Sequence, residues 1–325
     1  MSPTRFLIRG YVMPRADSGL LDRPEGYDTS TDASVTFAGD SFRGTSLWRM
    51  TARTFSENRL ALVGIGLIVF VILFCFVGPL LWHTNQVSAN IFAANEAPSA
   101  SHPLGTDDSG FDILGRLMSG GRSSIEVGLA VAIISTLFGV AYGTLAGFAG
   151  GAVDAVLMRI VDVFLAVPIV FLFIDLASIF RPTLWLLILV LSSLSWLSTA
   201  RLVRGETLSL RTREYVQAAR SIGGGRTRII VRHLIPNTMG TILVTATFQV
   251  ANAILVLAVL GYLGFSLPPP AATWGGMLEN GVNFLFDGYW WQIYPAGVMI
   301  VLTVVAFNFV GDALRDSFDV RLQQR

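Results

Sequence analysis

Long apolar runs separated by polar segments make up most of this 325-residue chain. A helix of about 20 apolar residues spans the hydrocarbon core of a bilayer, which is about 30 Å thick. Five runs predict such helices, at residues 60–82, 125–148, 182–203, 237–265 and 290–311. A sixth run, at 156–179, is weaker because Arg159, Asp162 and Asp175 interrupt it. We keep it, since an odd number of spans would place the termini on opposite sides of the membrane. The expected fold is therefore an all-α polytopic membrane protein with six transmembrane helices.

The polar segments predict the parts that lie outside the bilayer. Residues 1–45 lack a sustained apolar period and are rich in polar residues, glycine and proline, which predicts a disordered N-terminal extension. Residues 46–59 favour a helix on the membrane surface, and a simple lead-in to the first span is the alternative. The longest remaining segments are expected to be a loop at 83–122, a second loop at 204–236 and a tail at 314–325.

Arginine placement orients these segments. Residues 1–59, 201–236 and 312–325 lie on one side of the predicted bundle and hold eight, eight and three arginines. The opposite side holds Arg116, Arg122 and Arg181. Because cytosolic loops carry the excess of basic residues, both termini and the 204–236 loop are predicted to be cytosolic. The 83–122 loop is then extracytoplasmic.

Composition narrows the chemistry. The chain is 53% hydrophobic and 14% charged, well below the roughly 25% charged residues of a soluble domain. All 23 basic residues are arginine, so the chain cannot contain the lysine of a phosphate-binding P-loop. Cys75 is the only cysteine, and the three histidines (His83, His102 and His233) have no ligand spacing. We therefore predict no metal site, no cofactor and no ATP-hydrolysing site of the P-loop type.

One basic, amphipathic stretch between the fourth and fifth spans needs its own explanation: "EYVQAARSIGGGRTRIIVRHLIPN", residues 214–237. Glu214–Ser221 favours a helix that Gly223 and the two following glycines break, with a positive φ expected at Gly223. Residues 226–235 predict a second helix that Pro236 ends. Two interpretations stay open, a docking element for a cytosolic protein and an electrostatic anchor to anionic lipid.

Part of this stretch, "QAARSIGGGRTRIIVRHLIP", resembles the EAA loop of type I ABC importer permeases. Ala218, Ala219, Gly223 and Pro236 match that pattern in register, whereas Gln217 replaces its glutamate. His233 likewise replaces an isoleucine, and Ile235 stands for a leucine. "HPLGTDDSGFDILGRLMSGGRSSIEVG" (102–128) and the ending "FNFVGDALRDSFDVRL" resemble the dipeptide and oligopeptide subfamily. The resemblance covers residues 46–325.

The resemblance implies the type I ABC importer transmembrane fold, with a permease core at 123–313, in a bacterial inner membrane. It implies a non-catalytic permease subunit that forms half of the translocation path for di- or oligopeptides. The implied partners are a homologous second permease subunit, two cytosolic ABC ATPase subunits and an extracytoplasmic substrate-binding protein. The residues that it assigns to ATPase coupling are Glu214, Tyr215, Gln217, Ala218, Ala219, Arg220, Gly223, His233 and Pro236. Nickel or another non-peptide substrate is the alternative cargo, and a secondary transporter is a remote alternative class.

Several charged residues carry further expectations. Asp175, an acid within the weakest span, is a candidate for the translocation path, and a structural position in the bundle is the alternative. Asp107, Asp108 and Asp112 are expected to cap a short helix or to face the binding protein. Two pairs, Arg122 with Glu126 and Arg159 with Asp162, have the spacing of ion pairs on one helix face.

Overall fold

A computed structural model describes residues 55–84, 86–179 and 182–323 of the protein. The chain divides into residues 1–45 and 46–325, and the description below concerns the second unit. The expected disordered extension and residues 46–54 of the expected surface helix at 46–59 lie outside the described residues.

Among the described residues, five helices are long and apolar enough to cross a membrane. They are α2 (Arg59–Phe76), α4 (Ile113–Ala149), α7 (Leu184–Leu210), α10 (Ile235–Tyr262) and α12 (Tyr294–Gln323). The weak run is two helices, α5 (Gly151–Leu165) and α6 (Ile169–Ile179), which are bent by 83° at their junction and make a sixth span if they are counted together. Pro168 lies in that junction, where its missing N–H and its ring prevent a continuous helix. The described part of the chain therefore holds six hydrophobic segments when the bent pair is counted as one, broken span.

The shorter elements connect these helices. They are α3 (Gly78–Leu81), η1 (Ile91–Ala93), α8 (Glu214–Ser221), α9 (Arg226–Ile229), the π-helical η2 (Ile230–Leu234), α11 (Trp274–Val282) and η3 (Trp290–Gln292). In the described part of the chain no strand is present, apart from an isolated β-bridge between Thr106 and Asp112.

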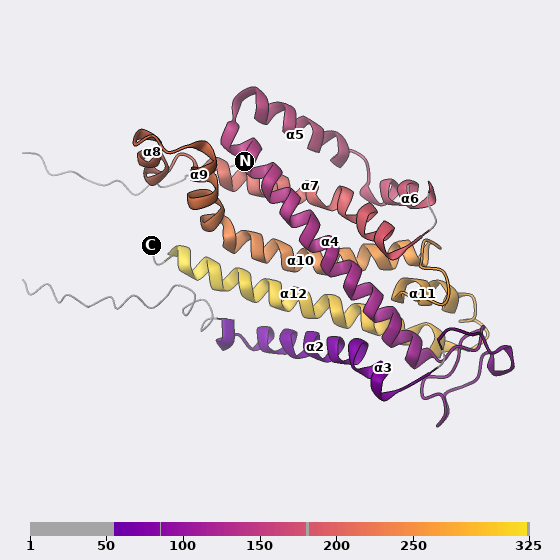
Figure 1. The fold of residues 1–325 in the computed structure, drawn as a ribbon. Coiled ribbons are helices and arrows are strands. Elements are labelled where there is room, and N and C mark those ends of the chain that lie inside the picture. The colour runs from indigo at the N-terminus through magenta and orange to yellow at the C-terminus, as the bar shows by residue number, and fades with distance from the viewer. Residues whose placement is uncertain (1–54, 85, 180–181, 324–325) are drawn as a thin grey trace, which may run out of the picture. The chain divides into compact units, whose positions relative to one another are not determined.

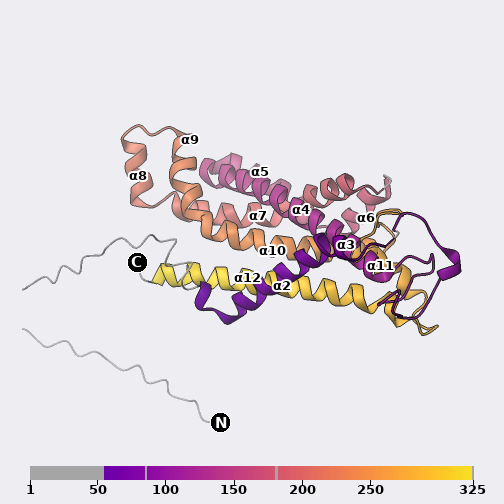
Figure 2. The same cartoon turned by 60° about the horizontal axis from the view of Figure 1, so that its bottom comes forward.

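Helix α4 organises the bundle. In Figures 1 and 2, α2, α12, α10 and α7 follow one another side by side, and α4 crosses them and contacts each one. Glycines 139, 143 and 147 of α4 face α7, where an added Cβ at each would lie under 3 Å from atoms of α7. Small residues at four-residue spacing allow helix backbones to approach this closely in lipid.

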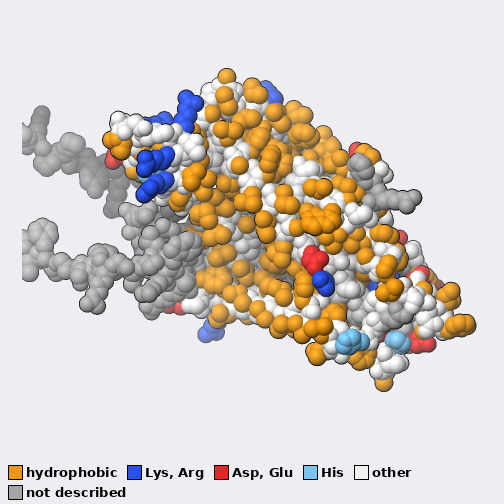
Figure 3. Space-filling model, in the orientation of Figure 1, with side chains coloured by type: hydrophobic (Ala, Val, Ile, Leu, Met, Phe, Trp, Pro, Cys, Tyr) orange, Lys and Arg blue, Asp and Glu red, His pale blue; other side chains and the backbone are white. Residues whose placement is uncertain are grey.

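Apolar side chains fill the interior and also cover the outside. Trp274 is fully buried, and its indole N–H donates to the carbonyl oxygen of Leu117 at 2.9 Å. Leu62, Leu137 and Val301 are examples of the many large apolar side chains that are more than half exposed. Figure 3 shows one such face, on which hydrophobic side chains predominate over the helices. A soluble monomer rarely exposes so large an apolar surface, so this face matches a lipid environment.

Two helices, α4 and α12, extend well beyond their predicted spans. Helix α4 begins at Ile113, inside the expected 83–122 loop, because the Asp112 carboxylate accepts a hydrogen bond from the N–H of Gly115 at 2.7 Å and caps the helix. Helix α12 continues to Gln323, through most of the expected 314–325 tail. Helices run past the ends of apolar runs because backbone hydrogen bonding does not require a hydrocarbon surrounding.

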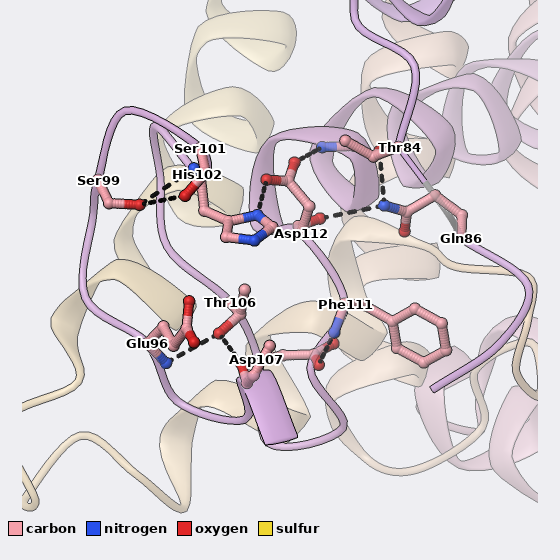
Figure 4. Close-up of polar contacts among 12 residues, drawn as sticks. Thr84, Gln86, Glu96, Ser99, Ser101, His102, Thr106, Asp107, Phe111 and Asp112 are labelled. Atoms are coloured by element: carbon pink, nitrogen blue, oxygen red, sulfur yellow. Dashed lines mark hydrogen bonds and ion pairs between the residues drawn. The ribbon is translucent and has the colours of Figure 1, made fainter. Parts of the chain in front are cut away.

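The loop before α4 is held by polar side chains (Figure 4). His102 Nδ1 lies 2.9 Å from Asp112 Oδ2, and the N–H of Glu96 donates to Thr106 Oγ1 at 2.8 Å. The Asp107 carboxylate accepts hydrogen bonds from the N–H groups of Ser109 and Phe111. The expected capping role is thus confirmed for Asp112, although the capped helix is long rather than short.

The two predicted helix-face ion pairs have different outcomes. Arg122 and Glu126 pair at 2.9 Å, as their spacing predicts. The prediction for Arg159 and Asp162 is wrong, because Asp162 Oδ1 lies 2.6 Å from Nη2 of Arg201 in α7. Arg201 belongs to a neighbouring helix, so the spacing of residues within α5 could not predict its contact with Asp162.

Candidate functional site

The residues with a predicted coupling role lie in one surface segment, residues 214–236, which we call the coupling segment. Only three residues separate the end of α7 from α8. Helix α8 buries one side chain completely, Val216, which packs with the buried Ile229 and Leu234. Phe148 at the end of α4 and Leu210 at the end of α7 pack against the same cluster. The segment is therefore seated directly on the ends of two spanning helices.

The end of α8 is closed by glycine. Gly223 has φ +82°, which confirms the expected positive φ. Its N–H donates to the carbonyl oxygen of Arg220 at 3.0 Å, and the N–H of Gly224 donates to that of Ala219 at 2.9 Å. These two bonds form a Schellman motif, which satisfies carbonyl groups at the helix end. The motif fixes the direction in which the chain leaves α8.

The second half of the segment differs from the prediction. Pro236 does not end a helix, because the helical path runs without interruption from Arg226 to Tyr262. Pro236 is the second residue of α10 and lies inside this continuous path. The wider turns of η2 precede it, and such π turns often occur at functional sites. The Asn237 side chain also donates to the carbonyl oxygen of His233.

The structure brings the nine predicted coupling residues together, and most of them are accessible. Ala219 and His233 are half-buried. The exposed ones are Glu214, Tyr215, Gln217, Ala218, Arg220, Gly223 and Pro236. The rings of Tyr215 and His233 lie 6.3 Å apart and link α8 to η2. The Arg220 guanidinium lies 4.8 Å from the centre of the Phe148 ring, so part of its side chain covers the end of α4.

Two apolar residues of this surface were not predicted. Ile222 is 87% exposed and Val231 is also exposed. Ile222 lies between the end of α8 and the first glycine of the motif. An apolar residue directly before a run of glycines is the sequence signal that could have identified it.

The exposed charge of the coupling segment is mostly basic. Arg220, Arg226, Arg228 and Arg232 are exposed, against the single exposed acid Glu214. Figure 3 shows basic side chains over the end of the molecule that carries α8 and α9. Exposed Ile222 together with nearby arginines suits a protein partner that has an apolar contact site and acidic residues around it. Arginines without an exposed apolar residue would suit an anionic membrane surface.

Asp175 is not part of this site. It lies on α6, with an exposed side chain, and its main-chain carbonyl accepts a hydrogen bond from the hydroxyl of Ser178. In Figure 1, α6 lies at the end of the bundle opposite α8. A role for Asp175 in the path stays a prediction.

A family comparison decides the class. The family model for the "binding-protein-dependent transport system inner membrane component" matches residues 139–324, more than half of the chain. The chain belongs to this family. It is a multi-pass inner membrane protein of the bacterial type. A second model, the "N-terminal TM domain of oligopeptide transport permease C", matches residues 46–98.

Family members of known name are similar over nearly the whole chain. The oligopeptide transport system permease protein OppC of Bacillus subtilis (strain 168) is 39% identical over 291 residues, which cover 88% of this chain and 95% of the relative. The dipeptide transport system permease protein DppC of the same organism is 37% identical over 272 residues, covering 84% and 85%. OppC of Escherichia coli (strain K12) is 37% identical over 278 residues, covering 85% and 92%. The family match includes the whole coupling segment.

Proposed function

We propose that this chain is a non-catalytic permease subunit of an ATP-driven peptide importer, and that its coupling segment docks an ATPase subunit. The observation that carries the proposal is the exposed, arginine-rich coupling segment, whose helix α8 is closed by the Gly223 motif and is seated on the ends of α4 and α7. Membership of a family of binding-protein-dependent transport components supports an ATPase subunit as the partner that binds this surface. Energy for transport then comes from another chain.

The packing supports movement of the segment as one body. Val216, Ile229 and Leu234 form a single buried cluster, so a displacement of α8 also displaces α9 and η2. Close packing makes such a unit resist deformation. Small Ala218 allows a partner backbone to approach α8, because it presents a single methyl group at the exposed surface.

The proposed assembly contains a homologous second permease subunit, two cytosolic ATPase subunits and an extracytoplasmic substrate-binding protein. In it the coupling segment and both termini are cytosolic, and the loop before α4 is extracytoplasmic. The arginine distribution along the sequence supports this orientation. The ATPases bind at the α8 end of the bundle, and the binding protein delivers substrate at the other end.

The proposed substrates are di- and oligopeptides. The named relatives are oligopeptide and dipeptide permeases, which supports peptides over nickel or another non-peptide cargo. Asp175 stays a candidate for a path residue that meets a peptide's amino group.

The test is reconstitution of the complete assembly in vesicles. ATP-dependent uptake of labelled peptide must require this chain. Ala218→Arg must prevent co-purification of the ATPase, because a large charged side chain enters a packed contact. Thr227→Arg, an exposed position on α9 outside the predicted contact residues, is the matched control and must leave co-purification unchanged. If both variants bind anionic vesicles more tightly and transport normally, the segment is a lipid anchor.

A further inference from the structure

The last turns of α7 are tied to its neighbours by three arginine side chains. Arg211 Nη1 donates to the carbonyl oxygen of Gly147 in α4 at 2.9 Å. Arg204 and Arg201 both pair with carboxylates of α5, and these two ion pairs differ in kind. They join the same two helices with the same residue types, so they form a natural comparison.

The pair of Arg204 with Asp154 is bidentate and shielded. Arg204 Nε lies 2.6 Å from Asp154 Oδ1, and Nη2 lies 2.7 Å from Oδ2. The Asp154 side chain is only 11% exposed and that of Arg204 32%. Two parallel bonds fix the relative orientation of the groups as well as their distance. This contact therefore holds α5 at a defined angle to α7.

The pair of Arg201 with Asp162 is looser. It has one bond, of 2.6 Å, and both side chains are about half exposed, at 53% and 50%. A single exposed ion pair is screened by solvent and constrains geometry weakly. It is the natural control for the first pair.

The turn of α7 that carries Arg204 is also fixed to α4. A Cβ on Gly143 would lie 2.3 Å from the carbonyl oxygen of Ala200 and 3.0 Å from the nitrogen of Arg204. One on Gly147 would lie 2.9 Å from the carbonyl oxygen of Arg204. Arg204 therefore makes both the backbone contact with α4 and the ion pair with α5. The three helices α4, α5 and α7 are joined at this residue.

Helix α7 leads to the coupling segment through only three residues, and α5 leads to the 83° bend before α6. A displacement at α8 would thus act on the ends of α7 and α4, on which the coupling segment is seated. From there it reaches α5 through the contacts around Arg204. The bend at residues 166–168 is the next place where the helical path can change direction.

We propose that the Arg204–Asp154 ion pair is the joint that transmits movement of the coupling segment to α5 and the broken α5–α6 span. Both are positioning residues, since they touch neither ATP nor substrate. The inference rests on the proposed function, because it requires an ATPase that moves α8. Its specific content is that the link between ATP hydrolysis and transport depends on this pair and not on Arg201–Asp162.

The experiment measures peptide uptake and ATP hydrolysis by the complete assembly in proteoliposomes. Arg204→Gln is expected to keep ATPase association and at least half of the hydrolysis. The ratio of peptide taken up to ATP hydrolysed should fall roughly tenfold, within the range that one substitution in a coupled network produces. Arg201→Gln should keep the wild-type ratio within about twofold. The reciprocal exchange D154R/R204D should recover a substantial part of the ratio, since it restores opposite charges.

If Arg204→Gln accumulates poorly in the membrane, a double variant provides the same test. D154N/R204Q leaves no unpaired charge, and its ratio must fall as well. A wild-type ratio in R204Q or in the double variant overturns the proposal, and so does a proportional loss of uptake and hydrolysis. An equal fall of the ratio in R201Q also overturns it, because the effect would then not be specific to the bidentate pair. Failure of the wild-type assembly to take up peptide would instead refute the proposed function.

Discussion

The N–H of Gly224 donates to the carbonyl oxygen of Ala219 at 2.9 Å, across the turn in which Gly223 adopts φ +82°. This bond belongs to the motif that ends α8. In this turn the side chain of Ile222 is exposed to solvent, and the chain then continues to α9. The direction of the whole coupling segment therefore depends on a backbone conformation that favours glycine.

Gly223→Ala is expected to weaken ATPase docking without disturbing the bundle. A Cβ at positive φ costs about 1 kcal/mol, which corresponds to about a fivefold loss of apparent affinity. Inside the chain the new methyl group meets no atom within 4 Å, so the effect is conformational rather than a clash. Titration of the ATPase onto reconstituted permease measures it.

Gly225→Ala is the matched control. Gly225 has φ −63° and equally open surroundings, so alanine fits there without strain. Equal affinities for the two variants would contradict the role given to the motif.

Ile222→Ser is expected to reduce ATPase binding while leaving the thermal stability of the permease unchanged. The side chain is 87% exposed, so its removal creates no cavity. An apolar anchor at the centre of an interface commonly contributes more than about 1 kcal/mol, so about a tenfold loss of affinity is expected. Ile179→Ser, another exposed isoleucine at the far end of α6, should have no effect on docking. Wild-type binding by the Ile222 variant would show that this residue is not the anchor.

The sequence predicted those features that depend on composition and local pattern. Apolar runs of sufficient length predicted the spanning helices, and a glycine after a short helix predicted the positive φ at Gly223. The interruption of the third span by charges predicted a weak helix, and Pro168 marks where it breaks. These features depend on residues that are close together in the sequence, through the hydrophobicity of their side chains and the allowed conformations of their backbone.

Features that depend on contacts between helices could not be predicted in the same way. Asp162 pairs with Arg201, which is 39 positions away along the chain, although Arg159 is three positions away. The passage of the helix through Pro236 required knowledge of the π turns before it. The exposure of Ile222 required the direction in which the chain leaves α8. Each of these is fixed by tertiary packing.

The loop before α4 should show an acid-dependent stability that comes from Asp107. Burial raises the pKa of the Asp107 carboxyl above its ordinary value of 3.8, against the opposing effects of the Phe111 N–H and the Arg116 charge. Between 3.8 and the raised pKa, the folded protein holds a proton that the unfolded chain has released. The free energy of unfolding therefore receives a favourable contribution as the pH falls through this window, and loses it as the pH rises.

Asp107→Asn removes that contribution while keeping an acceptor for the N–H groups of Ser109 and Phe111. The melting temperature of wild type relative to the variant should therefore increase as the pH is lowered from neutral towards about 4. Asp108→Asn, at an exposed neighbour, should reduce this pH dependence without abolishing it, because the Asp108 charge contributes to the raised pKa of the Asp107 carboxyl. A difference between wild type and Asp107→Asn that does not change with pH would show that Asp107 is not the group responsible.

Gly143→Ala tests the close packing of α4 on α7, which also sets the position of Arg204. The new methyl carbon would lie 2.3 Å from the carbonyl oxygen of Ala200. Because that contact is with main chain, no side-chain rotation can relieve it and the helices must separate. Overpacking of this kind costs about 1–3 kcal/mol, so the melting temperature of the purified permease should fall.

Gly66→Ala is the matched control, since Gly66 lies within α2 and a Cβ there meets nothing within 4 Å. Alanine in an open helical position is favoured over glycine by about 0.5–1 kcal/mol, so this control should be as stable as wild type or more so. If Gly143→Ala matched the control in stability, α4 and α7 would have to lie farther apart than the contacts at Ala200 require, and the joint at Arg204 would lose its support from α4.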